Sequence, residues 1–432
     1  TLGEGHPATL TALNDLAGIR MRRGELAAAR RDYTRALDGY TELFGATDAG
    51  TISIMNNLGV VLEQLGLFDE AEPLLRTALD LAEDNLGTAH PTTLRNMNNL
   101  ALLHESQGSF QRAGPLYELA LSILEADLGA AHPDTIAVRN NVAYLRMLEG
   151  DPRAAAGLFR AIHGDFAASL GPDHQNTLKA LNNLGRALRR AGELDAAEDA
   201  LEQARKRRAD ALGRRHPDTL RSELDLGLLA LGRGDFRAAE RSLRRTLREL
   251  ERVLGPQHPY TFEALGGLAD ALEGRQALDE ALEVRATGFR RRTAFFERML
   301  WATSENAREG YLRLHRPELD AYLSLIVRAG GAGAGRRALE VSLRRKGLLL
   351  RVSAEIQRIA ALGTDPELAE RAEALVDRRR TLAAVTLSGP VAEDPEAHLE
   401  RITALEAQVE ALEGELARAS ALYRQALSDY DL

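Results

Sequence analysis

The sequence predicts an all-α protein in which seven helical hairpins of 42 residues stack into an α-solenoid over residues 1–287, ahead of a further helical region. Apolar residues recur at spacings of three and four along the 432 residues, which is typical of helices, and no segment has the alternation of a strand. Aromatic residues make up only 5 % of the chain, as in helical arrays rich in alanine and leucine. A threonine also recurs every 42 residues without insertion or deletion, at Thr9, Thr51, Thr93, Thr135, Thr177, Thr219 and Thr261.

Two glycine columns divide each unit into two helices. A glycine after leucine or phenylalanine ends each unit, and a second glycine breaks the helix in mid-unit. The first column is Gly3, Gly45, Gly87, Gly129, Gly171, Gly213 and Gly255, and the second is Gly24, Gly66, Gly108, Gly150, Gly192 and Gly234. Each unit is therefore expected to be a helix, a tight turn and a helix, with a small residue in the second helix at Ala29, Ala71, Ala113, Ala155, Ala197, Ala239 and Ala281.

A histidine column precedes the first helix of most units. It comprises His6, His90, His132, His174, His216 and His258. A proline follows most of these histidines, and proline is tolerated at the first helical position. Asp48 takes the histidine's place in the second unit, and aspartate is a good helix cap. We therefore expect the column to cap helices, because a metal or catalytic site would need convergent side chains.

The 42-residue phase is lost after about Gly288, and residues 288–432 are predicted to form a second, all-helical region. Two long helices, about Pro366 to Leu387 and Asp394 to Leu427, flank the turn sequence "SGPVAED". Their pairing as an antiparallel, coiled-coil-like hairpin is indicated by the 4-3-4 spacing of Leu405, Val409, Leu412 and Leu416. The stretch "YLSLIVRAGGAGAG" could suggest a strand and a dinucleotide loop, but Arg336 occupies the third glycine position, so we expect an interhelix loop.

Composition and missing motifs exclude several function classes. The absence of cysteine excludes disulfides, thiolate metal sites and cysteine nucleophiles from this chain. A net charge of −9 argues against a nucleic-acid binder, because phosphates require a broad basic surface. No apolar run could span a membrane, so we expect a cytoplasmic protein that contacts neither membrane nor nucleic acid. The hydrolase, phosphate-loop and zinc-protease motifs are also missing, so we expect no enzyme activity, catalytic residue, metal or cofactor here.

The repeats resemble the tetratricopeptide repeat (TPR), lengthened from about 34 to 42 residues. The unit "LGTAHPTTLRNMNNLALLHESQGSFQRAGPLYELAL", Leu86 to Leu121, is closely similar to the repeats of kinesin light chains and their bacterial relatives. This resemblance implies a right-handed TPR superhelix whose first helices line a concave groove. The seventh unit departs from the pattern at Gly266, Gly267 and Gln276, as expected of a terminal capping repeat.

Paired asparagines occur in the middle of the first helices, where asparagine is a mediocre helix former. By analogy with TPR geometry the second of each pair faces the groove: Asn57, Asn99, Asn141 and Asn183. The resemblance to kinesin light chains implies that these amides hold the backbone of a bound peptide, since a carboxamide both donates and accepts hydrogen bonds. The alternative is that the amides only bridge neighbouring repeats.

The side chains expected to select the peptide differ between units. On the TPR register the third and fourth units offer Leu102, Tyr144 and Leu148, and the fifth and sixth offer Lys179, Arg186, Arg190 and Arg221. A peptide with an apolar anchor followed by acidic residues would suit this lining. The alternative is an ordinary solvated charged face.

Residues 289–432 resemble the region that precedes the caspase-like domain of CHAT proteins. The resemblance depends on Ser304-Glu305, Tyr311-Leu312, Tyr322 to Leu325, Ala338 to Glu340, Arg345 to Gly347 and the long hairpin. Because the chain also begins inside a repeat at Thr1, we expect a fragment that precedes an absent CHAT-like domain. The predicted function is a protein- or peptide-binding scaffold, the sensor arm of such a protease. The alternatives are a stand-alone adaptor, or an enzyme fragment that contributes substrate contacts.

Overall fold

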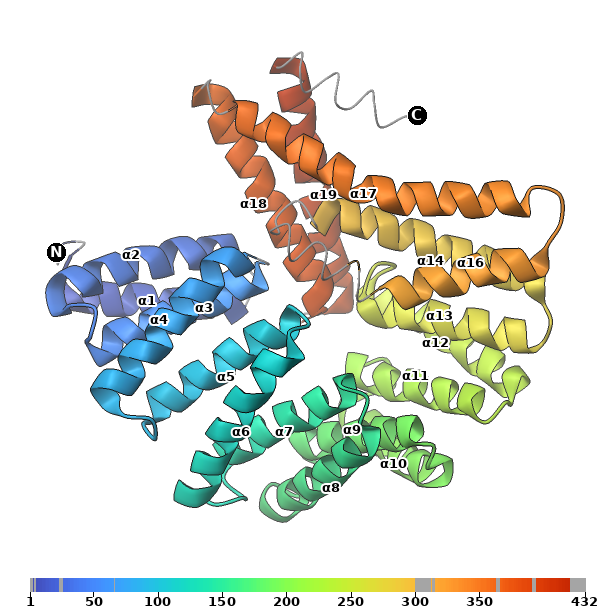
Figure 1. Ribbon diagram of the computed structural model, residues 1–432, viewed down its shortest axis with the longest axis horizontal. Coiled ribbons are helices and arrows are strands. Elements are labelled where there is room, and N and C mark those ends of the chain that lie inside the picture. Colours follow the sequence, from blue (N-terminus) through green and yellow to red (C-terminus); the bar gives the residue numbers. More distant parts are fainter. Residues whose placement is uncertain are drawn as a thin grey trace.

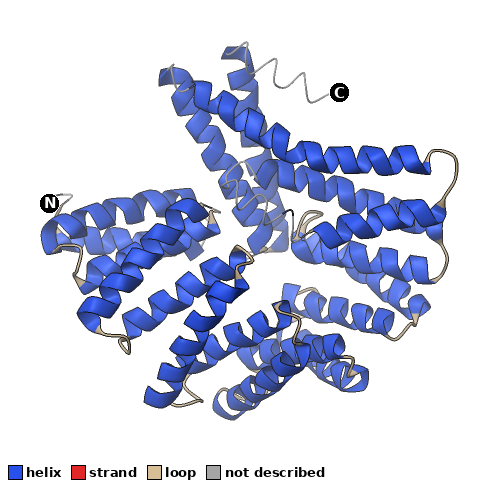
Figure 2. Ribbon diagram, viewed as in Figure 1, coloured by secondary structure: helices blue, strands red, loops and turns tan. Residues whose placement is uncertain are grey.

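The computed structural model describes residues 3, 5–22, 26–65, 67–299, 312, 315–362, 366–390 and 394–419. Within these ranges all regular structure is helical, which confirms the predicted class (Figure 2). The helices are α1 (Pro7–Arg22), α2 (Leu26–Phe44), α3 (Ala49–Gln64), α4 (Phe68–Leu86), α5 (Pro91–Ser106), α6 (Phe110–Asp127), α7 (Pro133–Leu148), α8 (Pro152–Ser169), α9 (Gln175–Ala191), α10 (Leu194–Leu212), α11 (Pro217–Gly232), α12 (Phe236–Leu254), α13 (Pro259–Gly274), α14 (Leu278–Met299), α16 (Arg316–Ala329), α17 (Ala334–Leu362), α18 (Pro366–Ser388) and α19 (Pro395–Ala419).

Helices α1 to α14 form the seven hairpins, and each helix packs against the next along the chain (Figure 1). The predicted alanine column is completely buried in every unit, because the two helices approach closely there. At Gly185, for example, an added Cβ would lie 2.6 Å from the Leu201 side chain and 3.3 Å from the Ala197 carbonyl oxygen. The buried clusters share residues from neighbouring units, so the core runs along the stack and most stabilisation is between neighbours.

The histidine column caps helices, as predicted. Each histidine Nδ1 accepts a hydrogen bond from the backbone N–H two residues later, at 3.1 Å for His258 and 3.2 Å for His90. Asp48 accepts from the N–H groups of Gly50 and Thr51 in the same position. An Nδ1 that accepts requires the proton on Nε2, so these capping imidazoles have a defined tautomer.

The threonine column has a related role. In five units the threonine hydroxyl donates to the carbonyl oxygen of the unit-ending glycine six residues earlier, for example Thr93 to Gly87 at 2.7 Å. Gly87 has φ +88°, a conformation that glycine adopts without steric cost. Threonine and glycine therefore share the 42-residue spacing because the same threonine–glycine hydrogen bond recurs at the junctions between units.

The turn inside the seventh unit differs from the others because it has a glutamine in place of the glycine. Gln276 occupies the mid-unit glycine position and has φ +62°, the one non-glycine residue with positive φ among the described residues. A left-handed conformation costs a side-chain-bearing residue about 1–2 kcal/mol. The loss of the glycine was visible in the sequence, and the backbone has kept the glycine's conformation.

The C-terminal region continues directly from the array. Helix α14 runs to Met299, so the predicted boundary at 287/288 falls inside a helix. The residues "YLSLIV" belong to α16 and the glycines after it connect α16 to α17, as expected of an interhelix loop. Some positions used in the sequence predictions lie outside the described residues: Ser304, Glu305, Tyr311, Gly24, Gly66 and residues 420–427.

Helices α18 and α19 form the predicted hairpin. Leu405, Val409 and Leu416 pack in its seam with partners from α18, and Leu412 is partly buried beside them. The hairpin contacts α2 of the first unit on one side and α12 and α14 on the other (Figure 1). Near α12, a Cβ added at Gly389 would lie 3.2 Å from Leu254 Cδ2, and Gly389 also has φ +68°. The hairpin thus connects the two ends of the array, which the repeat pattern did not predict.

Candidate protein-binding surface

The odd-numbered helices α1 to α13 form the inner row of the curved array. Helix α3 contacts α5, α9 contacts α11, and α11 contacts α13. The even-numbered helices of the units make no comparably extensive contacts with one another within the described residues. Elements on the inside of a bend lie closer together, so these contacts put the first helices on the concave side from α1 to α5 and from α9 to α13. Figure 1 shows the corresponding curve from α1 to α13.

The asparagines of the inner row form hydrogen bonds between units. Asn99 Nδ2 donates to Asn56 Oδ1 at 3.1 Å, and Asn141 Nδ2 donates to Asn98 Oδ1 at 2.9 Å. Each bond joins the second asparagine of one unit to the first asparagine of the unit before. Asn56 is 1 % exposed, so its amide is sealed between helices. The bridging arrangement left open by the sequence is therefore present at these two junctions.

The second asparagines nevertheless keep part of their surface. Asn57, Asn99, Asn141 and Asn183 are all half-buried, on α3, α5, α7 and α9. In Asn99 and Asn141 the amide nitrogen donates within the protein, while a carboxamide oxygen has room for two acceptor interactions. Contact of these four side chains with a peptide backbone stays a prediction.

Asp225 occupies the asparagine column in the sixth unit, 42 residues after Asn183, and it was missed by the sequence reasoning. Its carboxylate is completely buried and accepts from Asn182 Nδ2 at 2.8 Å and from Arg221 Nη2 at 2.9 Å. Burial by itself would raise the pKa of Asp225, but the guanidinium groups of Arg221 and Arg186 outweigh burial and lower it. The 42-residue spacing from Asn183 was a signal that could have identified this aspartate as part of the hydrogen bonds between units.

The structure corrects the role expected of Arg221. This side chain is 5 % exposed, its guanidinium binds Asp225 and Glu263, and it lies 4.7 Å from the Tyr260 ring centroid. Burial acts against the charged form, but the two carboxylates raise its pKa, so it stays a cation. A cation enclosed by its own carboxylates has no surface to offer a ligand, so Arg221 belongs to the junction of the sixth and seventh units.

The other side chains that were expected to select the peptide lie on helices of the inner row. Lys179 and Arg190 are exposed on α9, while the Arg186 side chain is 17 % exposed and its Nε lies 3.6 Å from Asp225 Oδ1. Tyr144 is half-buried on α7 and packs against the buried cluster of the fourth to sixth units. Tyr144, Lys179 and Arg190 thus lie on α7 and α9, the first helices of two consecutive units, while Asp225 partly neutralises Arg186.

Comparison with protein families agrees with this geometry. A model described as tetratricopeptide repeat matches residues 8–84, 51–126, 92–163 and 134–210, and a second model of the same description matches 224–284. Together these ranges cover more than half of the chain. The chain belongs to the tetratricopeptide repeat family.

Several solved structures are similar to part of this TPR chain. A putative kinesin light chain from Podosopora anserina is 22 % identical, with a TM-score of 0.43, covering 49 % of this chain and 99 % of that one. BtubC (BKLC) from P. vanneervenii is 22 % identical, with a TM-score of 0.44 and coverage of 52 % and 90 %. A Rap protein complexed with competence and sporulation factor is 15 % identical, with a TM-score of 0.42 and coverage of 78 % and 75 %. No curated protein matches the chain.

The described residues of the TPR chain offer neither a metal cluster nor a membrane-spanning helix. No group of three or more histidine, cysteine, aspartate or glutamate side chains in these ranges could hold a metal ion. In the same part of the chain, no helix combines the length and apolar character needed to cross a membrane.

Proposed function

We propose that this TPR chain is a scaffold that binds an extended segment of a protein partner along the inner row of its second to fifth units. The observation that supports this proposal most is the change in exposure along one column. Asn57, Asn99, Asn141 and Asn183 keep exposed surface, whereas Asp225 at the sixth position is completely buried. The accessible part of the inner row would therefore extend over the units that precede Asp225.

The preferred segment combines an apolar anchor with acidic residues. Tyr144, Leu102 and Leu148 are half-buried and have apolar surface to offer an anchor. Lys179 and Arg190 lie in the next unit and are exposed. Because exposed cations are screened by salt, the acidic part would contribute specificity and association rate more than affinity.

Selection from a random-peptide library on the full chain tests this proposal. Peptides that contain an aromatic or aliphatic residue followed by acidic residues are expected, and the double variant Lys179→Glu/Arg190→Glu should bind them at least tenfold more weakly. Arg336→Glu, an exposed charge reversal on α17, is the matched control. Equal binding by the double variant and the control would refute the placement in the inner row.

The finer proposal is that the chain is the sensor arm of a CHAT protease, with α16 to α19 transmitting partner binding to a domain beyond Leu432. The support is the order of the parts and the contact of the α18–α19 hairpin with both ends of the array. The gene is then expected to encode a histidine- and cysteine-containing protease domain after Leu432. A stand-alone adaptor would be indicated by a stop codon there, and an enzyme fragment by a different catalytic domain.

A further inference from the structure

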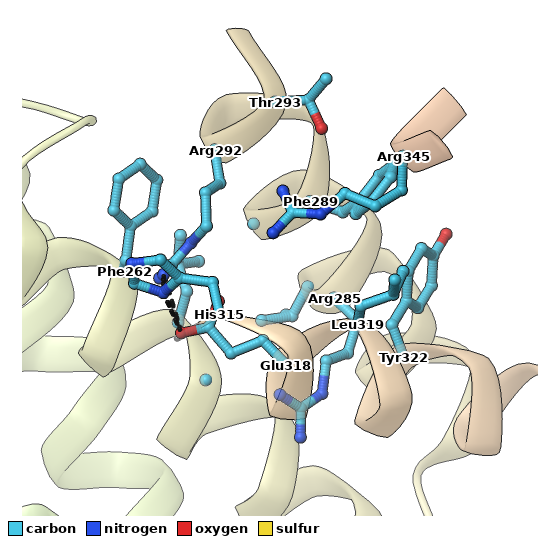
Figure 3. A pocket seen from close by; sticks show the side chains of 14 residues that line it. Phe262, Arg285, Phe289, Arg292, Thr293, His315, Glu318, Leu319, Tyr322 and Arg345 are labelled. Carbon is cyan, nitrogen blue, oxygen red and sulfur yellow. Dashed lines mark hydrogen bonds and ion pairs between the residues drawn. The ribbon is translucent and has the colours of Figure 1, made fainter. Parts of the chain in front are cut away.

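A small pocket lies between the seventh TPR unit and the helices that follow it. Its volume is about 50 Å³, and α13, α14, α16 and α17 all contribute to its wall (Figure 3). One water requires roughly 10–15 Å³ of such space, so a group as large as a carboxylate fits. Apolar side chains form much of the lining, among them Phe262, Phe289, Leu319 and Tyr322.

Two arginines place their guanidinium groups over aromatic rings at this pocket. Arg292 lies 4.4 Å from the Phe262 ring centroid, and Arg345 lies 4.7 Å from that of Phe296. Glu318 is the carboxylate that lines the pocket, and its Oε1 lies 2.8 Å from Arg292 Nη1. No carboxylate among the described residues is within ion-pair distance of Arg345, which donates to the Leu312 carbonyl oxygen at 3.4 Å.

The surroundings of Arg345 act against its charged form. Burial and the neighbouring Arg292 lower the pKa of Arg345 to about 10, although Glu318 acts in the opposite direction. Burial also lowers the pKa of His315, so that imidazole adds little positive charge at neutral pH. Among the described residues that line the pocket, Arg345 is thus a cation with no carboxylate within ion-pair distance, because Glu318 pairs with Arg292, and Arg285 pairs with Asp270 and Glu273.

Two polar groups of the lining also have unmet hydrogen-bonding capacity. Thr293 Oγ1 and Arg285 Nε are buried and make no hydrogen bond within the described part of the chain. A buried polar group without a hydrogen-bond partner destabilises the folded protein. Figure 3 shows Arg345 extending from α17 into the pocket, with Thr293 and Arg285 on its walls. A ligand with hydrogen-bond acceptors could bind Arg345 and one of these groups.

We propose that this pocket binds a carboxylate that carries a small apolar group. The negative charge of a carboxylate matches the cationic Arg345, and its oxygens can accept from that guanidinium and from one of the two unpartnered donors of the lining, the Thr293 hydroxyl or Arg285 Nε. The apolar lining fits a branched or short aliphatic group beside the carboxylate. A free organic acid and the C-terminal residue of a peptide share this chemistry. The site is separate from the inner row and does not depend on the function proposed for it.

The bound carboxylate would hold the end of the TPR array to α16 and α17. A ligand that binds only the folded state stabilises it by mass action. Binding is therefore expected to reduce hydrogen exchange in α14, α16 and α17 more than in α1 to α4, which lie far from the pocket in the array.

Calorimetric titration of the full chain with isobutyrate tests the proposal, and isobutyramide is the neutral control of the same shape. Saturable binding of isobutyrate alone is expected. Thr293→Val should weaken it several-fold, Arg345→Gln at least tenfold, and Arg336→Gln, an exposed position on the same helix, should leave it unchanged. If Arg345→Gln does not fold, Thr293→Val, which keeps the side-chain shape, decides the test.

The source of the carboxylate is distinguished by a second titration, with a short peptide that ends in valine and with its C-terminal amide. Tighter binding of the acid peptide than of isobutyrate assigns the site to a peptide C-terminus, and weaker binding assigns it to a free acid. The proposal is overturned if isobutyramide binds as well as isobutyrate, if Thr293→Val and Arg345→Gln both bind normally, or if inorganic phosphate binds more tightly than isobutyrate.

Discussion

Replacing His258 by asparagine is expected to make the folded protein less sensitive to mild acid. His258 caps α13 and is 5 % exposed, beside His398, Arg221 and the edge of the Tyr260 ring. Burial is the main reason that its pKa falls from 6.5 to about 4, and the neighbouring His398 and Arg221 side chains lower it further. Asparagine is also a good helix cap, so the substitution mainly removes the titrating ring.

The magnitude follows from the difference between the folded and unfolded pKa values. Between pH 6.5 and pH 4 the unfolded chain binds a proton that the folded protein excludes, so stability is present above pH 6.5 and is lost as the pH falls toward 4. From pH 7 to pH 5 this linkage should cost about 2 kcal/mol of unfolding free energy, because one pKa unit corresponds to about 1.4 kcal/mol. Carboxylates elsewhere contribute equally to both proteins.

Urea unfolding followed by circular dichroism at pH 7 and pH 5 measures this difference. The wild-type protein should lose about 2 kcal/mol more than His258→Asn over that interval. His174→Asn changes an exposed cap in the same way, and it controls for the effect of the new capping side chain. Equal losses in the wild-type protein and His258→Asn would refute the conclusion that a buried, neutral histidine is maintained at this junction.

Three further substitutions test other parts of the array. Glu105→Gln should be more stable than wild type by up to about 3 kcal/mol at pH 8 and no more stable at pH 4. The reason is that burial raises the Glu105 pKa to about 7, so folding favours the protonated form. Urea unfolding at both pH values checks this, and a stability difference that does not change with pH would contradict it. Asp225→Ala should lower the free energy of unfolding by about 3–5 kcal/mol in the same assay, because it leaves Arg221 and Asn182 buried without their partner. A decrease below about 1 kcal/mol would contradict the role given to Asp225. Gln276→Gly should gain about 1 kcal/mol by relieving a left-handed backbone, whereas a lower melting temperature would indicate that the glutamine side chain contributes more than the strain costs.

Much of the repeat architecture could be predicted because it is local and periodic. A capping histidine, the proline after it and a glycine with positive φ act over a few residues, so their 42-residue spacing defined the hairpins correctly. The heptad-like spacing in α19 predicted the packing of Leu405, Val409 and Leu416 for the same reason, since a seam needs apolar residues on one helix face.

The candidate surface was predicted less completely, because exposure depends on neighbours that are distant in sequence. Lys179 and Arg221 occupy equivalent positions in consecutive units, yet the first is exposed and the second is buried against Glu263 and Tyr260. A register places a side chain on a helix face, but it does not specify what covers that face.

The sequence by itself thus determined the helices, their caps and turns, and the number of units, because each depends on residues within one or two helical turns. Tertiary structure decided which amides became bridges between units, which arginine was enclosed, and where the α18–α19 hairpin connects the two ends of the array. These outcomes depend on the curvature accumulated over seven stacked units, and small rotations at each junction add up to a geometry that no single repeat specifies.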